Sequence, residues 1–298
     1  MVTLTREANR QARGLAAPPR PVVVAPSGRA ARAIALASGK GGVGKTNLAV
    51  NLGISLVRRG RKVLVFDADL GLANVHVLLG ARVERTLWHV AMGRCTLADI
   101  LWREPSGLWV APGGCGLAEL ARLDGFGRGR LLRQLAEIEP CFDFVLVDVA
   151  AGVGEQVVQF LRTVGEVMVV TTPEPAALTD AYALVKLTAE EAPGTRFGVV
   201  VNAARSTTEG RDAAARLQMT VRRFLGLHLE LWGVLPFCGQ LPAAVRAQVP
   251  VASAYPDSPF AAAVDRLSRR LSALERVGGQ QAAPRLSRAL HLMLSQPG

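Results

Sequence analysis

The stretch S-G-K-G-G-V-G-K-T-N-L-A-V-N-L-G, residues 38–53, indicates the fold class of the chain. Residues 39–46 within it fit the pattern G-x-x-x-x-G-K-[ST], after an apolar run typical of a strand and before a run typical of a helix. Glycines in such a turn let backbone N–H groups close around phosphate oxygens without Cβ clashes, and the helix that follows points its positive end at them. The stretch therefore predicts a phosphate-binding loop.

Two side chains at the end of this loop suit a nucleotide with a bound metal ion. Lys45 would neutralise the charge of the β- and γ-phosphates, and the hydroxyl of Thr46 would ligate Mg²⁺. The expected ligands are therefore a nucleoside triphosphate and magnesium. The predicted nucleotide-binding residues of the loop are Gly39, Lys40, Gly41, Gly42, Val43, Gly44, Lys45, Thr46 and Asn47.

Short apolar runs alternate with amphipathic stretches from residue 32 onward. Continuous apolar strands separated by helices indicate a mostly parallel sheet covered by helices on both faces. The predicted fold class is α/β, a doubly wound sheet of the P-loop NTPase type. The predicted strands are 33–38, 62–67, 108–112, 142–148, 166–172, 197–202 and 229–236, and a predicted helix over 260–276 closes the domain.

The whole chain has 298 residues, of which 50 % are hydrophobic, enough for one full-sized core. We expect a basic tail at 1–31, the α/β domain at 32–277, and a linker with an amphipathic helix at 278–298. No apolar run approaches the roughly 18–20 residues of a membrane span, and the N-terminus lacks a secretory apolar block, so we expect a cytoplasmic protein. The four cysteines are widely spaced, which is typical of reduced thiols.

The net charge of +11 is concentrated at the two ends of the chain. Residues 1–32 carry six arginines and one glutamate, and residues 261–298 carry six arginines and two acidic residues. Basic tails suit an anionic membrane surface, an acidic partner or DNA, and solvated surface charge without a partner is the alternative.

Three aspartates stand at or just after the ends of predicted strands. Asp67 and Asp69 are two residues apart, so they share a face on the rim that carries the phosphate-binding loop. Asp148 ends the apolar run 142–148, where a buried strand would present a carboxylate to Mg²⁺. Thr46 and Asp148 are therefore predicted metal-site residues.

The segment K-G-G-V-G-K-T, residues 40–46, resembles the deviant Walker A motif of the MinD/ParA family. The resemblance implies ATP as the substrate and a homodimer in which Lys40 reaches the phosphates of the partner's nucleotide, much as an arginine finger does. It also implies that Asp69 orients the attacking water and that Asp67 lies near the water shell of the metal. Capping of a turn is the alternative for Asp67. The implied catalytic residues are Lys40, Lys45 and Asp69.

The same resemblance implies where adenine lies. Asn202 ends a predicted strand at the place where the family has an Asn whose amide reads the adenine edge. Pro236 and Phe237, in G-V-L-P-F, match the other adenine-side loop. Cys238 replaces a usual acidic residue of the family, and Val149 replaces a common hydroxyl residue. The change at Val149 bears on the rate of hydrolysis more than on binding.

Residues 69–80, 110–123 and 170–187 together resemble the flagellar number regulators, the FlhG/FleN/YlxH branch of this family. The resemblance implies control of flagellar number and placement, through a partner GTPase of the signal-recognition type (FlhF) and flagellar basal-body or C-ring proteins. The segment R-Q-A-R-G-L, residues 10–15, is similar to the family's partner-activating segment, with Arg10 in place of an Asp.

The last segment, residues 283–296, has the pattern of a short interfacial helix. Its apolar residues recur at helical spacing, and Arg285 and Arg288 lie on or beside the opposite face, where they would meet anionic headgroups. Packing of the apolar stripe on the protein's own surface is the alternative. By position the segment resembles the family's membrane-targeting helix, which places the protein at the inner face of the cell membrane. The predicted membrane residues are Leu286, Leu290, Met293 and Leu294.

The sequence thus predicts an ATP-dependent dimerising switch that hydrolyses ATP slowly and controls flagella at the membrane. Two alternatives stay open. One is a division-site or DNA-partitioning ATPase, although specific DNA binding is not expected because the basic charge lies mainly in the tails. The other is a nucleotide-loaded regulator of a transcription factor with little hydrolysis, to which Val149 points.

Overall fold

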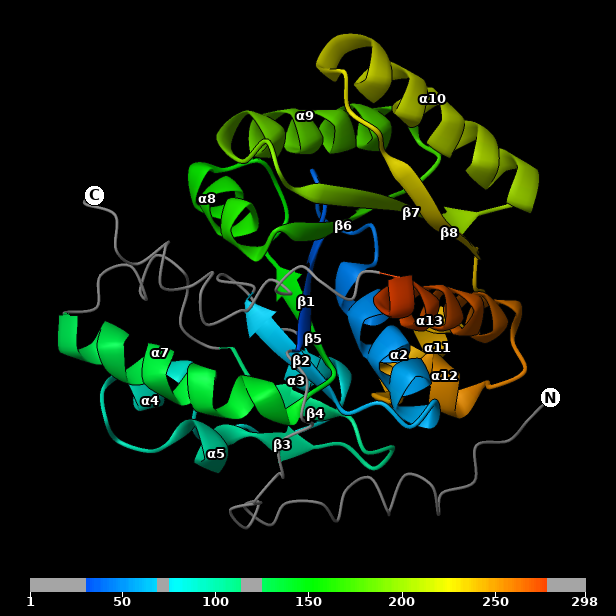
Figure 1. The fold of residues 1–298 in the computed structure, drawn as a ribbon. Coiled ribbons are helices and arrows are strands. Elements are labelled where there is room, and N and C mark those ends of the chain that lie inside the picture. Colours follow the sequence, from blue (N-terminus) through cyan, green and yellow to red (C-terminus); the bar gives the residue numbers. More distant parts are fainter. Residues whose placement is uncertain (1–30, 69–74, 114–124, 278–298) are drawn as a thin grey trace.

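The computed structural model describes residues 31–68, 75–113 and 125–277 (Figure 1). An eight-stranded sheet runs through it in the order β3-β4-β2-β5-β1-β6-β7-β8. Every neighbouring pair is parallel except β3 and β4, which are antiparallel. The predicted α/β, mostly parallel, doubly wound fold is therefore confirmed.

All seven predicted strands are present, with ends shifted by at most two residues. The sequence did not indicate β3, which has only two residues and pairs with one short neighbour at the edge of the sheet. The strands are β1 (Arg32–Ala37), β2 (Val63–Ala68), β3 (Trp102–Arg103), β4 (Trp109–Ala111), β5 (Phe144–Val149), β6 (Glu166–Thr171), β7 (Arg196–Ala204) and β8 (Glu230–Pro236).

Helices cover both faces of the sheet, so two apolar cores form. The central strands are buried along their whole length, which explains their unbroken apolar runs. One face carries α4 (Leu87–Ala91), α5 (Leu97–Ile100), α7 (Gly125–Ile138), η1 (Glu139–Cys141), α8 (Glu155–Val164), α9 (Pro175–Glu191) and α10 (Thr207–Leu225). The other carries α2 (Lys45–Arg58), α3 (Val75–Leu78), α11 (Leu241–Ala247), α12 (Val251–Ala254) and α13 (Pro259–Val277).

Strand β1 occupies the point at which the strand order reverses. It pairs with β5 on one side and β6 on the other, while the chain continues from β1 to β2, one strand further out. In open α/β sheets, ligands bind beyond the carboxyl ends of the strands at such a point. The loop of residues 38–44 follows β1 there, which is where the sequence predicts phosphate binding. Among the described residues no helix is long and apolar enough to cross a membrane.

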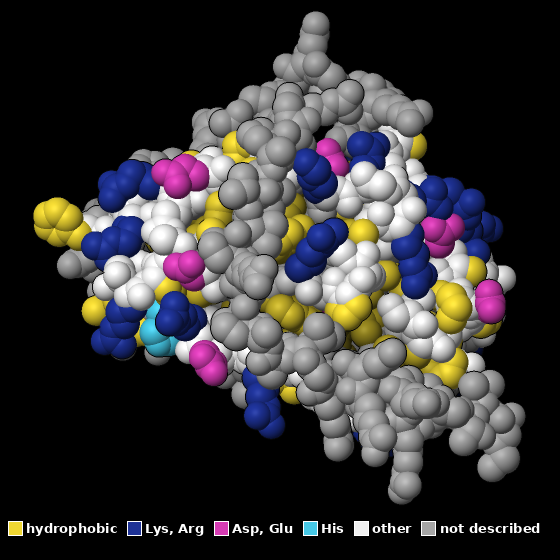
Figure 2. Space-filling model, turned by 90° about the horizontal axis from the view of Figure 1, so that it is seen from below, with side chains coloured by type: hydrophobic (Ala, Val, Ile, Leu, Met, Phe, Trp, Pro, Cys, Tyr) yellow, Lys and Arg dark blue, Asp and Glu magenta, His cyan; other side chains and the backbone are white. Residues whose placement is uncertain are grey.

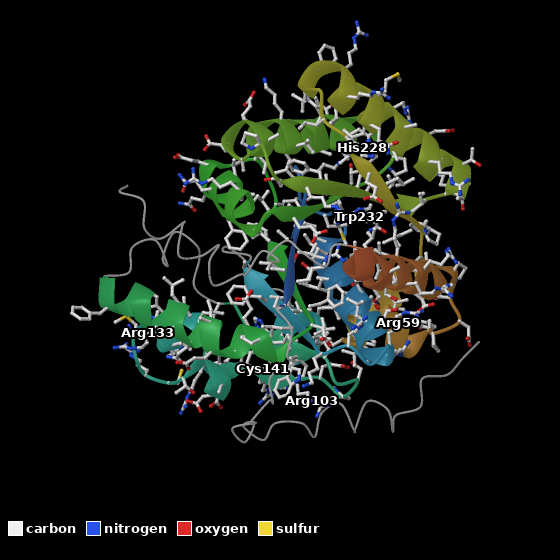
Figure 3. All side chains as sticks on the ribbon, in the orientation of Figure 1. Arg59, Arg103, Arg133, Cys141, His228 and Trp232 are labelled. Carbon is white, nitrogen blue, oxygen red and sulfur yellow. The ribbon has the colours of Figure 1, made fainter. Side chains whose placement is uncertain are left out.

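A chain of ion pairs ties the amino-terminal ends of four strands to α13. Glu166 accepts from Arg32 at 2.6 Å and pairs with Arg196 at 3.4 Å. Arg196 also pairs with Glu230 at 3.1 Å, and Arg270 of α13 reaches Glu230 at 2.6 Å. Arg59, directly after α2, extends toward α13 and pairs there with an aspartate (Figure 3). These contacts fix the closing helix on the sheet, away from the phosphate-binding loop.

The carboxylate of Glu230 makes stability depend on pH. Its burial raises the pKa, but hydrogen bonds from Arg270, Trp232 and Arg196 outweigh burial, so the pKa of Glu230 lies below its usual value. Because the folded-state pKa is lowered, this stabilisation is complete above the pKa of an unfolded glutamate, about 4.3, and is lost as the pH falls below it.

We therefore expect Glu230→Gln to lower the urea midpoint of unfolding near neutral pH and to flatten its fall in acid. Urea titrations from about pH 6 to about pH 3 measure both effects. Glu190→Gln is the matched control, because Glu190 lies exposed on α9, where its carboxylate is 3.9 Å from Nζ of Lys186. An acid slope for Glu230→Gln equal to that of the unmodified protein would contradict the assignment.

Candidate functional site

The loop between β1 and α2 has the backbone that a phosphate cradle needs. Gly44 caps α2 with φ at 91°, a conformation that favours glycine, and a Cβ there would lie 2.5 Å from Nδ2 of Asn202. At the start of the loop a Cβ on Gly39 would collide with the carbonyl group of Asp180 in α9. The two glycines therefore let the loop pack tightly between β7 and α9.

The first turn of α2 is suited to an anion. It contains no acidic residue, and its first hydrogen-bonded amide is that of Leu48, which donates to the carbonyl of Gly44 at 2.9 Å. The preceding amides at Lys45, Thr46 and Asn47 thus have no intrahelical acceptor, and a helix start of this kind attracts phosphate. Lys45 is 7 % exposed, so its charge lies beside the loop and is largely shielded from water.

A hydroxyl and two carboxylates come together beside this turn. Oγ1 of Thr46 donates to Oδ2 of Asp148 at 2.6 Å. Asp67 of β2 is the direct register neighbour of Asp148 of β5, and both are 1 % exposed. This oxygen set fits a magnesium ion, which prefers carboxylate and hydroxyl oxygens and keeps part of its water shell. Oδ2 of Asp67 also accepts from the amide of Val75, the first residue of α3, at 3.2 Å, so this carboxylate contacts the start of that helix as well.

Lys40 lies at the outer rim of the loop. Its Nζ is 2.7 Å from Oε2 of Glu174, and the two side chains are 35 % and 67 % exposed. Sequence reasoning missed Glu174. The available indication was an acidic residue directly before Pro175, the first residue of α9, because an anion is favoured at a helix start.

The predicted adenine-side residues lie at the carboxyl ends of β7 and β8. Nδ2 of Asn202 donates to the carbonyl of Val43 at 2.8 Å, so this side chain contacts the phosphate-binding loop itself. Phe237 is 68 % exposed, and its amide donates to the carbonyl of Ala204 at 2.8 Å. Cys238 is buried, with Sγ 3.5 Å from Oε1 of Gln240. The reading of adenine by Asn202 stays a prediction.

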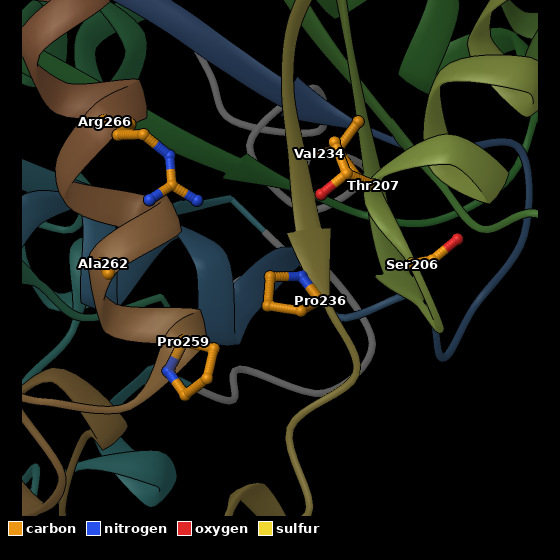
Figure 4. Close-up of a pocket in the computed structure, with 7 residues that line it drawn as sticks. All are labelled: Ser206, Thr207, Val234, Pro236, Pro259, Ala262 and Arg266. Carbon is orange, nitrogen blue, oxygen red and sulfur yellow. The ribbon is translucent and has the colours of Figure 1, made fainter.

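A pocket of about 200 Å³ opens beside Pro236, at the outer side of β8 (Figure 4). Its walls come from β8, from the start of α10 and from α13, and Arg266 reaches into it from α13. The pocket therefore borders the predicted adenine side without including the phosphate-binding loop. Its lining consists of Ser206, Thr207, Val234, Pro236, Pro259, Ala262 and Arg266.

Val149 does not face the site. Its side chain is 0 % exposed and belongs to the apolar core on the α7–α10 face, whereas the neighbouring Asp148 meets Thr46 of α2 on the opposite face. The alternation of a strand explains the difference. The absence of a hydroxyl residue at position 149 therefore leaves no gap beside Thr46.

Several predicted residues lie outside the described residues. These are the catalytic Asp69 and the partner-activating segment 10–15. The membrane residues Leu286, Leu290, Met293 and Leu294 lie outside them as well. Their roles stay predictions from the sequence.

Comparisons with known proteins agree with this geometry. Residues 31–191 match a family described as an AAA domain. The antiactivator FleN of Pseudomonas aeruginosa is 42 % identical over 238 residues, which cover 80 % of this chain and 85 % of FleN. The chain belongs to the MinD/ParA family of ATPases. Within the MinD/ParA family its branch is FlhG/FleN, and it is an ATP-hydrolysing enzyme.

Two further MinD/ParA proteins support the assignment. The flagellum site-determining protein YlxH of Helicobacter pylori is 33 % identical over 239 residues, covering 79 % of this chain and 80 % of YlxH. The septum site-determining protein MinD of Pyrococcus horikoshii, solved in complex with Mg-ADP, superposes with a TM-score of 0.66 at 26 % identity. That match covers 84 % of this chain and 100 % of the MinD chain. The fold is therefore MinD-like.

Proposed function

We propose that this chain is an ATP-dependent dimerising switch that regulates the number and placement of flagella at the membrane. The observation that carries the proposal is the pair of lysines around one phosphate-binding loop. Lys45 is buried at the start of α2, whereas Lys40 stands at the exposed rim. The names of FleN, an antiactivator, and of YlxH, a flagellum site-determining protein, support the flagellar output.

The loop and the first turn of α2 hold the phosphates of ATP. Backbone amides of the loop and the charge of Lys45 meet the β- and γ-phosphates, while Pro236 and Phe237 flank the base. Thr46, Asp67 and Asp148 would hold magnesium, which would supply positive charge to neutralise the phosphates. Mg-ADP in the Pyrococcus horikoshii MinD supports this assignment.

Lys40 acts on the nucleotide of a second copy of the chain. In the single chain it is held by Glu174, but an ion pair as exposed as this one is worth only about 0–1 kcal/mol. Lys40 can therefore leave Glu174 at little cost when two ATP-loaded loops face each other. There it neutralises phosphate charge on the partner's ATP, and Asp69 orients the water that attacks the γ-phosphate.

Dimerisation couples the nucleotide to the membrane. One interfacial helix at residues 283–296 is a weak anchor, but two helices on one dimer bind together and gain by avidity. Hydrolysis, slow and stimulated by a partner, separates the dimer and releases it. The downstream partners are a signal-recognition-type GTPase and flagellar basal-body or C-ring proteins.

We expect co-sedimentation with anionic liposomes to require both ATP and residues 280–298. The full chain is compared in ADP and in ATP, and in ATP with a chain that ends at Gly279. Pelleting of the full chain in ATP alone is the predicted result, because only the dimer presents two helices. Neutral liposomes are the control for the contribution of Arg285 and Arg288.

Equal pelleting in all three states would contradict a membrane switch. The nucleotide would then control the choice of a protein partner instead. The name antiactivator of the 42 % identical relative favours that second function, the regulation of a transcription activator. ATP turnover measured with and without the candidate partner separates the two functions.

DNA partitioning is the weaker alternative. On the face shown in Figure 2, Lys and Arg side chains are scattered and acidic side chains lie among them. A sequence-independent DNA surface requires clustered positive charge.

A further inference from the structure

The backbone is irregular at the end of β7, where Asn202 lies. The pairing of β7 with β8 runs from Val201 opposite Val234 to Ala204 opposite Pro236, so β7 has one extra residue there. Ala203 takes up this extra residue with φ at 55°, which is unfavourable for a residue with a Cβ. Bulges of this kind redirect a side chain next to functional sites, and strain persists only where the surroundings enforce it.

The redirected side chain of Asn202 makes a hydrogen bond to the phosphate-binding loop. Asn202 is 8 % exposed, and its Nδ2 donates to the carbonyl of Val43 at 2.8 Å. The next loop residue is Gly44, at which even a methyl group would lie 2.5 Å from the same nitrogen. The amide nitrogen therefore occupies the space that a Cβ would need, immediately before the first turn of α2.

We propose that Asn202 is a positioning residue for the phosphate-binding loop. Its amide nitrogen holds the Val43 carbonyl and so fixes the direction of the amides at Gly44 and Lys45 before any nucleotide arrives. Because Nδ2 donates to the carbonyl of Val43, Oδ1 is the atom of this side chain that can contact a base. One side chain thus couples the base side of the site to the phosphate side.

The inference rests on the proposed function of the loop as a phosphate site and adds to it. A residue that only read adenine would affect ligands that have a base and no others. A residue that positions the loop affects phosphate chains with or without a base, because preorganised amides bind an anion without a cost of reordering. Inorganic tripolyphosphate, which has phosphates and no base, distinguishes the two roles.

The test compares the binding of ATP and of tripolyphosphate, both with magnesium. Asn202→Leu keeps nearly the size of the side chain, and Asn202→Ala is the second variant in case leucine prevents folding. Both leave the charge unchanged, so a change in anion binding cannot come from an added charge. Phe237→Ala is the matched control, because this exposed side chain lies on the predicted adenine-side loop, whereas the carbonyl of Val43 is held by Asn202.

Binding is measured as the rise in melting temperature that each ligand gives over the same variant without ligand, so a change in fold stability is cancelled. We expect both Asn202 variants to bind tripolyphosphate roughly fivefold more weakly than the unmodified protein does, which corresponds to the loss of one hydrogen bond. Their binding of ATP should be weakened by at least the same factor. Phe237→Ala should weaken the binding of ATP and leave the binding of tripolyphosphate unchanged. Hydrogen exchange at residues 43–46 should be faster in the Asn202 variants without ligand.

Two results would overturn the inference. If the Asn202 variants bind tripolyphosphate as the unmodified protein does and exchange at the same rate, Asn202 does not position the loop, and the phosphate site itself stands. If the unmodified protein does not bind tripolyphosphate, the phosphate site fails and the inference fails with it.

Discussion

Replacement of Lys45 by alanine is expected to lower ATP turnover about a hundredfold to a thousandfold, the range for loss of one preorganised charge-stabilising group. Lys45 is 7 % exposed at the start of α2, where its charge is screened little by water. Charge develops on the transferred phosphoryl group as the reaction proceeds, and a fixed cation there stabilises the transition state. The measurement is phosphate release at saturating Mg-ATP.

The matched control for this variant is Lys186→Ala. Lys186 lies exposed on α9 and pairs with Glu190 at 3.9 Å, so the same change of charge is made away from the loop. Turnover of the control should equal that of the unmodified protein. Equal turnover in Lys45→Ala and Lys186→Ala would show that the loop does not carry the reaction.

Replacement of Lys40 by alanine is expected to abolish the ATP-dependent dimer while leaving ATP binding by the single chain nearly unchanged. Two triphosphates that face each other across an interface repel, and a lysine from each chain relieves the repulsion. The single chain does not need Lys40, which in it contacts the carboxylate of Glu174 at the rim. Sedimentation velocity in ATP and in ADP measures the dimer, and nucleotide titration measures binding.

Glu174→Gln is the informative companion of this variant. It removes the charge that holds Lys40 in the single chain, so dimerisation in ATP should be retained. If Lys40→Ala dimerises like the unmodified protein, Lys40 does not act in the dimer. If instead Lys40→Ala loses ATP binding as a single chain, Lys40 serves its own nucleotide.

Most of the fold could be predicted from the sequence because the central strands are buried on both faces. Their apolar runs are continuous and end at polar residues, so the runs at 62–67 and 166–172 gave the strands to within one residue. The two-residue strand β3 has no such run. Trp102 and Arg103 pair at the edge of the sheet with the short strand β4, and this depends on tertiary contacts.

The candidate site was predictable where one local motif sets the chemistry. The glycines and Lys45 follow from the pattern in residues 39–46, and the structure places Thr46 against Asp148 as the motif and the strand end require. Contacts between distant segments were not predictable. Asn202 meets Val43 across 159 positions, and Lys40 meets Glu174 across 134.

Alternation along a strand was available from the sequence but was not applied to Val149. Asp148 and Val149 are neighbours at a strand end, and a departure at Val149 was expected to bear on hydrolysis. In the structure the two side chains point to opposite faces, so Val149 is part of an apolar core. The alternation of β5 decides this, since Asp148 faces α2.

Action of Lys40 on the nucleotide of the other chain is tested by mixing two inactive variants. Lys40→Ala keeps Asp69 but lacks the lysine, and Asp69→Ala keeps Lys40 but lacks the carboxylate proposed to orient water. In a mixed dimer the nucleotide on the Lys40→Ala chain has its own Asp69 and receives Lys40 from the other chain. We predict that the mixture hydrolyses ATP well above the sum of the two variants measured alone. Turnover equal to that sum would contradict action across the dimer.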